Sequence, residues 1–149
     1  MSATPDPWQL PQAAREFMPH RPPMQLVERL LVAENGNGEV ETVLAADSPL
    51  TGADGRIEEA ALVELIAQAY AAVQGYCDLR AGRQPGRGFL VGIRQAQMTA
   101  PARCGERLRI AVRTQARVES FAMVEGEVHC GERLLASAVI KLWLPGGEA

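Results

Sequence analysis

One continuous stretch, from Ile57 to Leu79, constrains the fold of this chain more than any other part of the sequence. It is rich in helix-forming residues, and neither glycine nor proline interrupts it before Gly75. Apolar side chains occupy every face of the predicted helix, and a helix that is apolar all round is buried. We therefore expect one long central helix that the rest of the chain encloses.

Glu64 is the one side chain between Ala60 and Cys77 that is charged at neutral pH. A carboxylate in a buried helix is unfavourable unless it is paired, protonated or functional. Gln68 follows four residues later, on the same side of the helix, where it can orient the Glu64 carboxyl group. A purely structural glutamate, hydrogen-bonded to Gln68 or to a partner's backbone, is the alternative to a catalytic one.

Length and composition indicate one globular domain over residues 1–149, with a loose tail at residues 1–8. The central stretch is too interrupted by polar residues for a membrane span, and the N-terminal residues lack the apolar run of a secretory signal. The three cysteines have no CxxC spacing, which argues against a disulfide framework or a metal site and favours the cytoplasm.

Alternating and β-rich patterns predict six strands around the helix. A short helix is expected at Pro11–Phe17, and the short linkers between the last three strands predict an antiparallel meander. Two strands, one helix and four strands give an α+β domain of the hotdog type, a curved antiparallel sheet wrapped around the helix. One sheet cannot cover such a helix on all sides, so we expect a homodimer. The predicted strands are 25–33, 39–45, 89–98, 107–118, 121–130 and 134–144.

Positive charge is concentrated between Arg80 and Arg117, which contain nine arginines and one acidic residue, whereas the whole chain has a net charge of -3. This distribution is consistent with solvated strand faces and loops, or with a docking surface for an acidic partner. Nucleic acid is not expected as a partner, because no recognised motif and few aromatic residues accompany the arginines.

Four motifs, in this order, resemble those of the 3-hydroxyacyl-acyl-carrier-protein dehydratases. The segment HRPPMQLVER, which begins at His20, resembles the family's HRYPFLLVDR, and its prolines make it stiff. The segment ELIAQA from Glu64 resembles EAMAQA, and FLVGI from Phe89 resembles FFAGI. Pro101 followed by GERL from Gly105 resembles the turn Pro-x-x-x-Gly-Asp-x-Leu.

The loop at residues 48–59 is shorter than in those dehydratases and resembles the dehydratase-like hotdog proteins of aryl-polyene gene clusters. The resemblance implies dehydration of a 3-hydroxyacyl thioester of the kind used in fatty acid biosynthesis. It also implies an acyl chain on the phosphopantetheine arm of an acidic acyl carrier protein, with no metal and no other cofactor. His20 and Glu64 would form the catalytic pair, one residue from each subunit of the dimer.

Dehydration removes a proton from C2 of the acyl chain and releases hydroxide from C3. An imidazole with a pKa near ~6.5 can accept the proton at neutral pH. A carboxyl group whose pKa is raised by burial can supply a proton to the leaving hydroxyl. We therefore assign His20 as the base and Glu64 to the hydroxyl or its water. Core packing is the alternative role for some of the residues predicted to bind the acyl chain, which are Met24, Gln68, Phe89 and Gly92.

Two other functions stay open at this stage. A hotdog acyl thioesterase would use Glu64 to activate water and would release a free thiol, whereas a dehydratase yields a 2-enoyl thioester. A degenerate acyl-binding subunit would bind the carrier protein without catalysing either reaction.

Overall fold

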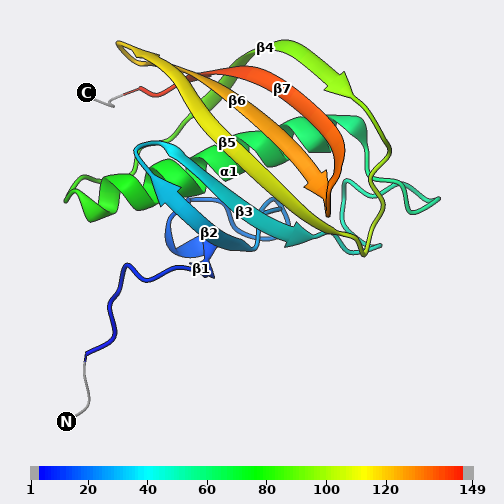
Figure 1. Cartoon of the computed structure of the whole chain (residues 1–149), viewed down its shortest axis with the longest axis horizontal. Helices are drawn as coiled ribbons and strands as arrows, with labels where there is room; N and C mark the ends of the chain where they lie inside the picture. Colours follow the sequence, from blue (N-terminus) through cyan, green and yellow to red (C-terminus); the bar gives the residue numbers. More distant parts are fainter. Residues whose placement is uncertain (1–3, 146–149) are drawn as a thin grey trace.

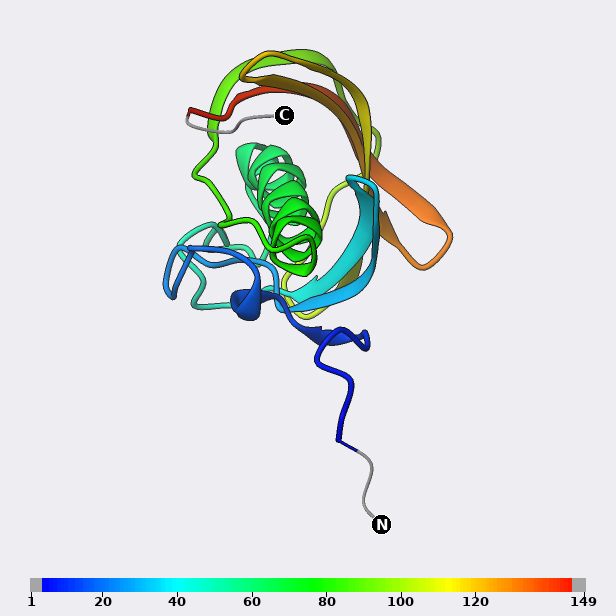
Figure 2. The ribbon, with the colours of Figure 1, turned by 90° about the vertical axis from the view of Figure 1, so that its left-hand side faces the viewer.

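A single α-helix, α1 (Glu59–Arg80), runs through the concave side of a curved antiparallel sheet (Figure 1 and Figure 2). The computed structural model describes residues 4–145. Most apolar side chains of α1 are buried, among them Leu62, Leu65 and Val73, whereas one stripe of the helix is only half-buried: Glu64, Ala67, Ala71, Gln74 and Asp78. The predicted central helix is therefore confirmed, but it is not enclosed on every side, because the half-buried stripe carries Glu64, Gln74 and Asp78.

The sheet contains seven strands in the order β1-β2-β3-β5-β6-β7-β4, and all neighbouring strands are antiparallel. The last three strands in the sequence form the predicted meander, and this arrangement is the expected hotdog fold. The strands are β1 (Gln12–Ala13), β2 (Arg29–Glu34), β3 (Asn37–Val43), β4 (Phe89–Met98), β5 (Arg107–Val118), β6 (Phe121–Cys130) and β7 (Arg133–Trp143).

The N-terminal segment differs from the helix predicted at Pro11–Phe17. Only Ala14–Glu16 forms a helical turn, of the 3-10 type, because the two residues before it pair with β2. The Ala14 N–H donates to the Glu28 carbonyl at 2.8 Å, which ties the turn to the sheet instead of extending the helix.

The predicted loose tail covers residues 1–8, of which residues 1–3 lie outside the described residues. Trp8 is half-buried and packs edge-on against Tyr76 of α1, with 5.7 Å between the ring centroids. The Tyr76 hydroxyl also donates to the Trp8 carbonyl oxygen at 2.6 Å. Contact with the core therefore begins at Trp8.

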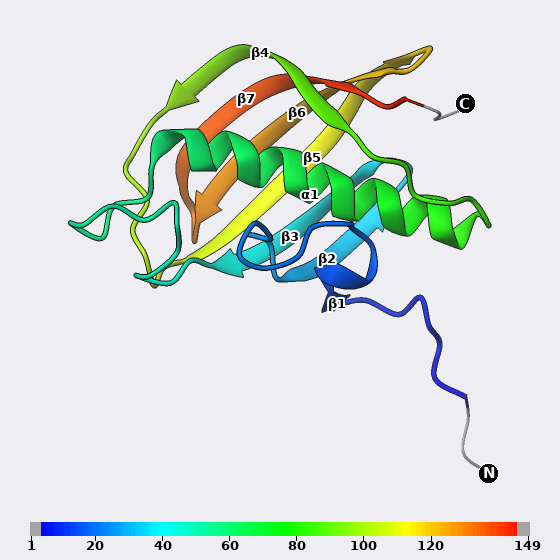
Figure 3. The ribbon, with the colours of Figure 1, turned by 180° about the vertical axis from the view of Figure 1, so that it is seen from behind.

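Strand β4 lies at one edge of the sheet and is paired with β7 alone among the described residues. Its apolar side chains are exposed: Leu90 is 38% exposed, Val91 52% and Ile93 51%. Seen from behind (Figure 3), α1 crosses in front of the sheet and the segment before β2 lies beside it. Among the described residues, no helix is long and apolar enough to cross a membrane.

Gly75 allows α1 to pass close to the N-terminal segment. A Cβ atom at this position would lie 1.8 Å from the Phe17 carbonyl oxygen, which belongs to the backbone and cannot turn aside. We predict that Gly75→Ala lowers the free energy of unfolding by about 1–3 kcal/mol, although alanine is the better helix former. Chemical denaturation measures the change.

The matched control is Gly86→Ala, because a Cβ atom there would meet nothing within 4 Å. Its free energy of unfolding should stay close to that of the unmodified protein. Equal stability of the two variants would contradict the close contact between Gly75 and Phe17.

Candidate active site

A stiff segment before β2, which we call the proline arm (residues 18–26), is held against α1 by one buried side chain. The Leu26 N–H donates to Gln68 Oε1 at 2.8 Å, and Gln68 Nε2 donates to the Met24 carbonyl at 2.8 Å. The Thr42 hydroxyl of β3 donates to the Leu26 carbonyl, and both Thr42 and Gln68 are only 1% exposed. The proline arm therefore has a fixed position on the helix.

The same amide group also orients Glu64. Gln68 Nε2 donates to Glu64 Oε1 at 2.9 Å, one helical turn away. Both amide protons of Gln68 are thus used within the protein, and its oxygen already accepts the Leu26 N–H. These hydrogen bonds hold Glu64 and the proline arm in place, and substrate binding by Gln68 stays a prediction. Glu64 is half-buried, and its other carboxyl oxygen, Oε2, takes no part in the hydrogen bond with Gln68.

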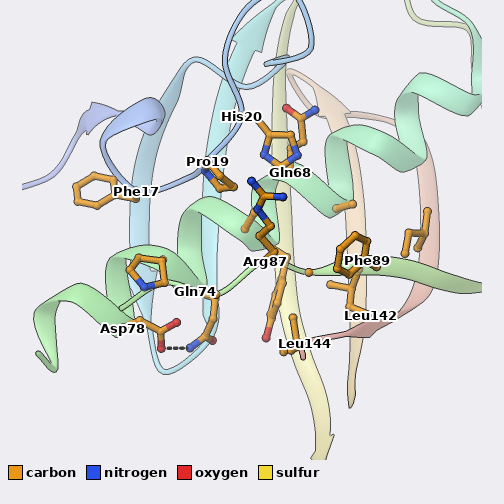
Figure 4. Close-up of a pocket in the computed structure, with 18 of the residues that line it drawn as sticks. Phe17, Pro19, His20, Gln68, Gln74, Asp78, Arg87, Phe89, Leu142 and Leu144 are labelled. Atoms are coloured by element: carbon orange, nitrogen blue, oxygen red, sulfur yellow. Dashed lines mark hydrogen bonds between the residues drawn. The ribbon is translucent and has the colours of Figure 1, made fainter. Parts of the chain in front are cut away.

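A cavity of about 820 Å³ lies between the proline arm, α1, the start of β4 and the end of β7 (Figure 4). This volume suits a small-molecule site. His20 and Glu64 are both on its wall, so one chain brings the two predicted catalytic residues to the same cavity. The walls include Phe17, Pro19, Ala67, Ala71, Tyr70, Gln74, Asp78, Arg83, Gln84, Arg87, Leu90, Arg117, Leu142 and Leu144.

Two buried polar atoms at the cavity have no hydrogen-bond partner among the described residues, His20 Nδ1 and the Tyr70 hydroxyl oxygen. Burial raises the pKa of Tyr70, and the nearby Arg117 guanidinium opposes this rise. The tyrosine is therefore neutral near physiological pH. Among residues 4–145, no group of three or more His, Cys, Asp or Glu side chains is placed to hold a metal ion.

The other predicted binding residues are placed differently. Phe89 borders the cavity, but it is 47% exposed and its ring packs against Trp143, with 5.7 Å between the centroids. Met24 is 62% exposed and Gly92 lies within β4, and neither is on the cavity wall that the described residues form. Substrate binding by Met24 and Gly92 stays a prediction, as does the sharing of His20 and Glu64 between subunits.

Sequence reasoning did not single out the polar residues further along the cavity. Gln74 and Asp78 follow Glu64 at helical spacing on one face of α1, so the periodicity of the helix could have found them. Gln74 Nε2 donates to Asp78 Oδ1 at 2.9 Å. Arg87 and Arg117 belong to the arginine-rich segment, but no local pattern shows which of its arginines face inward.

Comparison with known proteins gives one family and one fold. The family model described as ApeP-like, ApeP dehydratase, matches residues 12–149. The structure is similar to the dehydratase heterocomplex ApeI:P from Xenorhabdus doucetiae, with a TM-score of 0.84 and 22% identity over 91% of this chain and 92% of that chain. No functionally curated protein has a significant sequence match to the chain.

Two more distant structures share the fold. One is Cj0977, a sigma28-regulated virulence protein from Campylobacter jejuni, with a TM-score of 0.62 and 14% identity over 91% of this chain and 89% of that one. The other is a hypothetical thioesterase protein with coenzyme A from Streptococcus pneumoniae, with a TM-score of 0.62 and 12% identity over 80% of this chain and 87% of that one.

The hydrogen bonds of Gln68 predict a measurable loss of stability. Gln68→Leu should lower the free energy of unfolding by about 1–3 kcal/mol, because it leaves the buried Leu26 N–H without an acceptor. The matched control is Gln74→Leu, which removes one half-buried hydrogen bond on the same helix and should cost less than about 1 kcal/mol. Chemical denaturation of both variants checks this, and equal losses would argue against the special position of Gln68.

Proposed function

This chain belongs to the ApeP-like dehydratase family, and from that premise we propose that it dehydrates a 3-hydroxyacyl thioester carried by an acyl carrier protein. The product is the 2-enoyl thioester. The observation that carries the proposal is that one cavity has both His20 and Glu64 on its wall, with Glu64 oriented by Gln68. The two groups are an imidazole and a carboxyl, which the reaction needs as a base and as a partner for the hydroxyl.

The His20 imidazole removes the proton from C2, and the electron pair of that C–H bond becomes the second bond between C2 and C3. The C3–O bond breaks with its electrons, and the leaving hydroxide takes a proton from Glu64 or from a water that Glu64 holds. The oxygen then departs as water. A proton transfer from His20 back to Glu64 resets the site. The stiffness of the proline arm keeps the imidazole in place during these steps.

A carrier-bound substrate fits the shape and charge of the cavity. The wall follows α1 from Glu64 to Asp78, which corresponds to roughly 21 Å at the rise of an α-helix. A long, narrow chain, such as an acylated phosphopantetheine arm, matches this form. The coenzyme A named for the Streptococcus pneumoniae protein carries the same arm. The arginine-rich segment supplies positive charge for an acidic carrier protein.

We further propose that the exposed edge of β4 joins two subunits into a homodimer. Within residues 4–145 the outer edge of β4 has no partner strand, and an open edge with exposed apolar side chains is a ready site for pairing with another chain. Phe89 and Leu90, at the start of β4, also border the cavity, so the active site would adjoin the interface. The structure from Xenorhabdus doucetiae is a heterocomplex, which makes a non-identical hotdog subunit the alternative partner.

We predict that His20→Ala lowers kcat for formation of the enoyl thioester by about 10²–10⁴-fold, the usual contribution of general acid–base catalysis. Glu64→Gln should also lower kcat. Product analysis of a 3-hydroxyacyl thioester separates the enoyl thioester from free thiol. The matched control is His129→Ala in β6, since His129 is not on the cavity wall.

Unchanged turnover by the folded His20→Ala variant would remove His20 from the mechanism. Free thiol as the main product of the unmodified protein would instead identify a thioesterase.

The proposed interface predicts that Ile93→Glu shifts the protein toward monomers in analytical ultracentrifugation. The variant places a charge in the apolar edge of β4, where Ile93 is 51% exposed. Val118→Glu is the matched control, because Val118 is 65% exposed but lies on β5, inside the strand order. If Ile93→Glu and Val118→Glu form dimers of equal stability, the interface does not lie at the edge of β4.

A further inference from the structure

The proposed reaction creates a charge for which His20 and Glu64 provide no partner. When the C2 proton leaves, negative charge develops on the thioester oxygen, and enzymes stabilise such an oxygen with fixed hydrogen-bond donors. Backbone N–H groups at the first turn of a helix can serve this purpose. Here the first residues of α1, Glu59 to Val63, do not line the cavity, and the lining residues of the helix begin at Glu64.

Most other donors on the cavity wall are already engaged. Both amide protons of Gln68 bond within the protein, and Gln74 donates to Asp78. Arg83 Nη2 lies 3.1 Å from Asp78 Oδ1 and forms an ion pair with it. Arg117 lies beside the Tyr70 hydroxyl, close enough to affect its pKa.

Arg87 is different from these donors. It lines the cavity together with His20 and Glu64, and no carboxylate among residues 4–145 lies within ion-pair distance of it. It is an exposed residue of the segment that joins α1 to β4, between Gly86 and Gly88. In Figure 4 its side chain points toward His20.

We propose that Arg87 is a third catalytic residue, whose guanidinium group donates hydrogen bonds to the thioester oxygen as its charge develops. This inference rests on the proposed dehydration. A guanidinium group stays charged at every pH of interest and offers several N–H donors in one plane, which suits an oxygen that gains negative charge. The proton moves from C2 to His20, the electron pair is delocalised onto the thioester oxygen near Arg87, and its return expels the hydroxide from C3.

The experiment measures kcat and KM for Arg87→Gln, Arg87→Lys and the unmodified protein. The substrate is one 3-hydroxyacyl chain, attached either to 4'-phosphopantetheine or to N-acetylcysteamine, which has no phosphate. Loss of one donor to a developing oxyanion typically lowers kcat by about 10²–10³-fold. We expect Arg87→Gln to lose this factor on both substrates with little change in KM, and Arg87→Lys to recover part of it.

Arg15→Gln is the matched control, since Arg15 is an exposed arginine of the 3-10 turn at Ala14–Glu16 that neither lines the cavity nor belongs to the arginine-rich segment. It should keep the unmodified rate. A rise in KM for Arg87→Gln on the phosphopantetheine substrate alone would overturn the proposal and make Arg87 a phosphate ligand. Unchanged kinetics of Arg87→Gln would also overturn it, while leaving the dehydration intact. An unmodified protein that forms no enoyl thioester would overturn the proposed function, and the role of Arg87 with it.

Discussion

The buried amide of Gln68 is the interaction on which the rest of the site depends. It joins the proline arm, the central helix and the carboxyl group of Glu64 through hydrogen bonds to Leu26, Met24 and Glu64. A buried amide that lacked these partners would cost free energy, so the bonds favour this relative arrangement of the three segments. The position of His20 beside the same cavity follows, because the stiff arm allows few alternatives once Leu26 is fixed.

The sheet and the helix set the limits within which this arrangement works. The sheet buries one side of α1. On its other side, the cavity lies between the helix, the proline arm and the start of β4, and the described residues do not close this cavity. The exposed apolar residues of β4 lie at that same side. Catalysis and subunit association would therefore be linked, since the edge of β4 proposed to bind a second subunit also borders the proposed active site.

The central helix and the last four strands could be predicted because their patterns are long and regular, and the bounds at 89–98, 107–118 and 121–130 match the structure. The short helix expected at Pro11–Phe17 is reduced to a 3-10 turn at Ala14–Glu16, because pairing with β2 and the bond from Ala14 to Glu28 override the local preference. The motifs predicted His20 and Glu64 as a pair, and the structure places both on the wall of one cavity. The hydrogen bonds of Gln68 and the place of Arg87 on the cavity wall depend on tertiary contacts that no local pattern encodes.

The most direct test of the central claim follows a 3-hydroxyacyl pantetheine thioester in D₂O by proton NMR, with the unmodified protein as catalyst. A base and a hydroxyl partner facing one substrate should produce vinyl protons of the 2-enoyl thioester while the thioester bond stays intact. Deuterium should also appear at C2 of the remaining substrate through the reverse reaction. Release of free thiol without vinyl protons, or no change in the spectrum, would contradict the account.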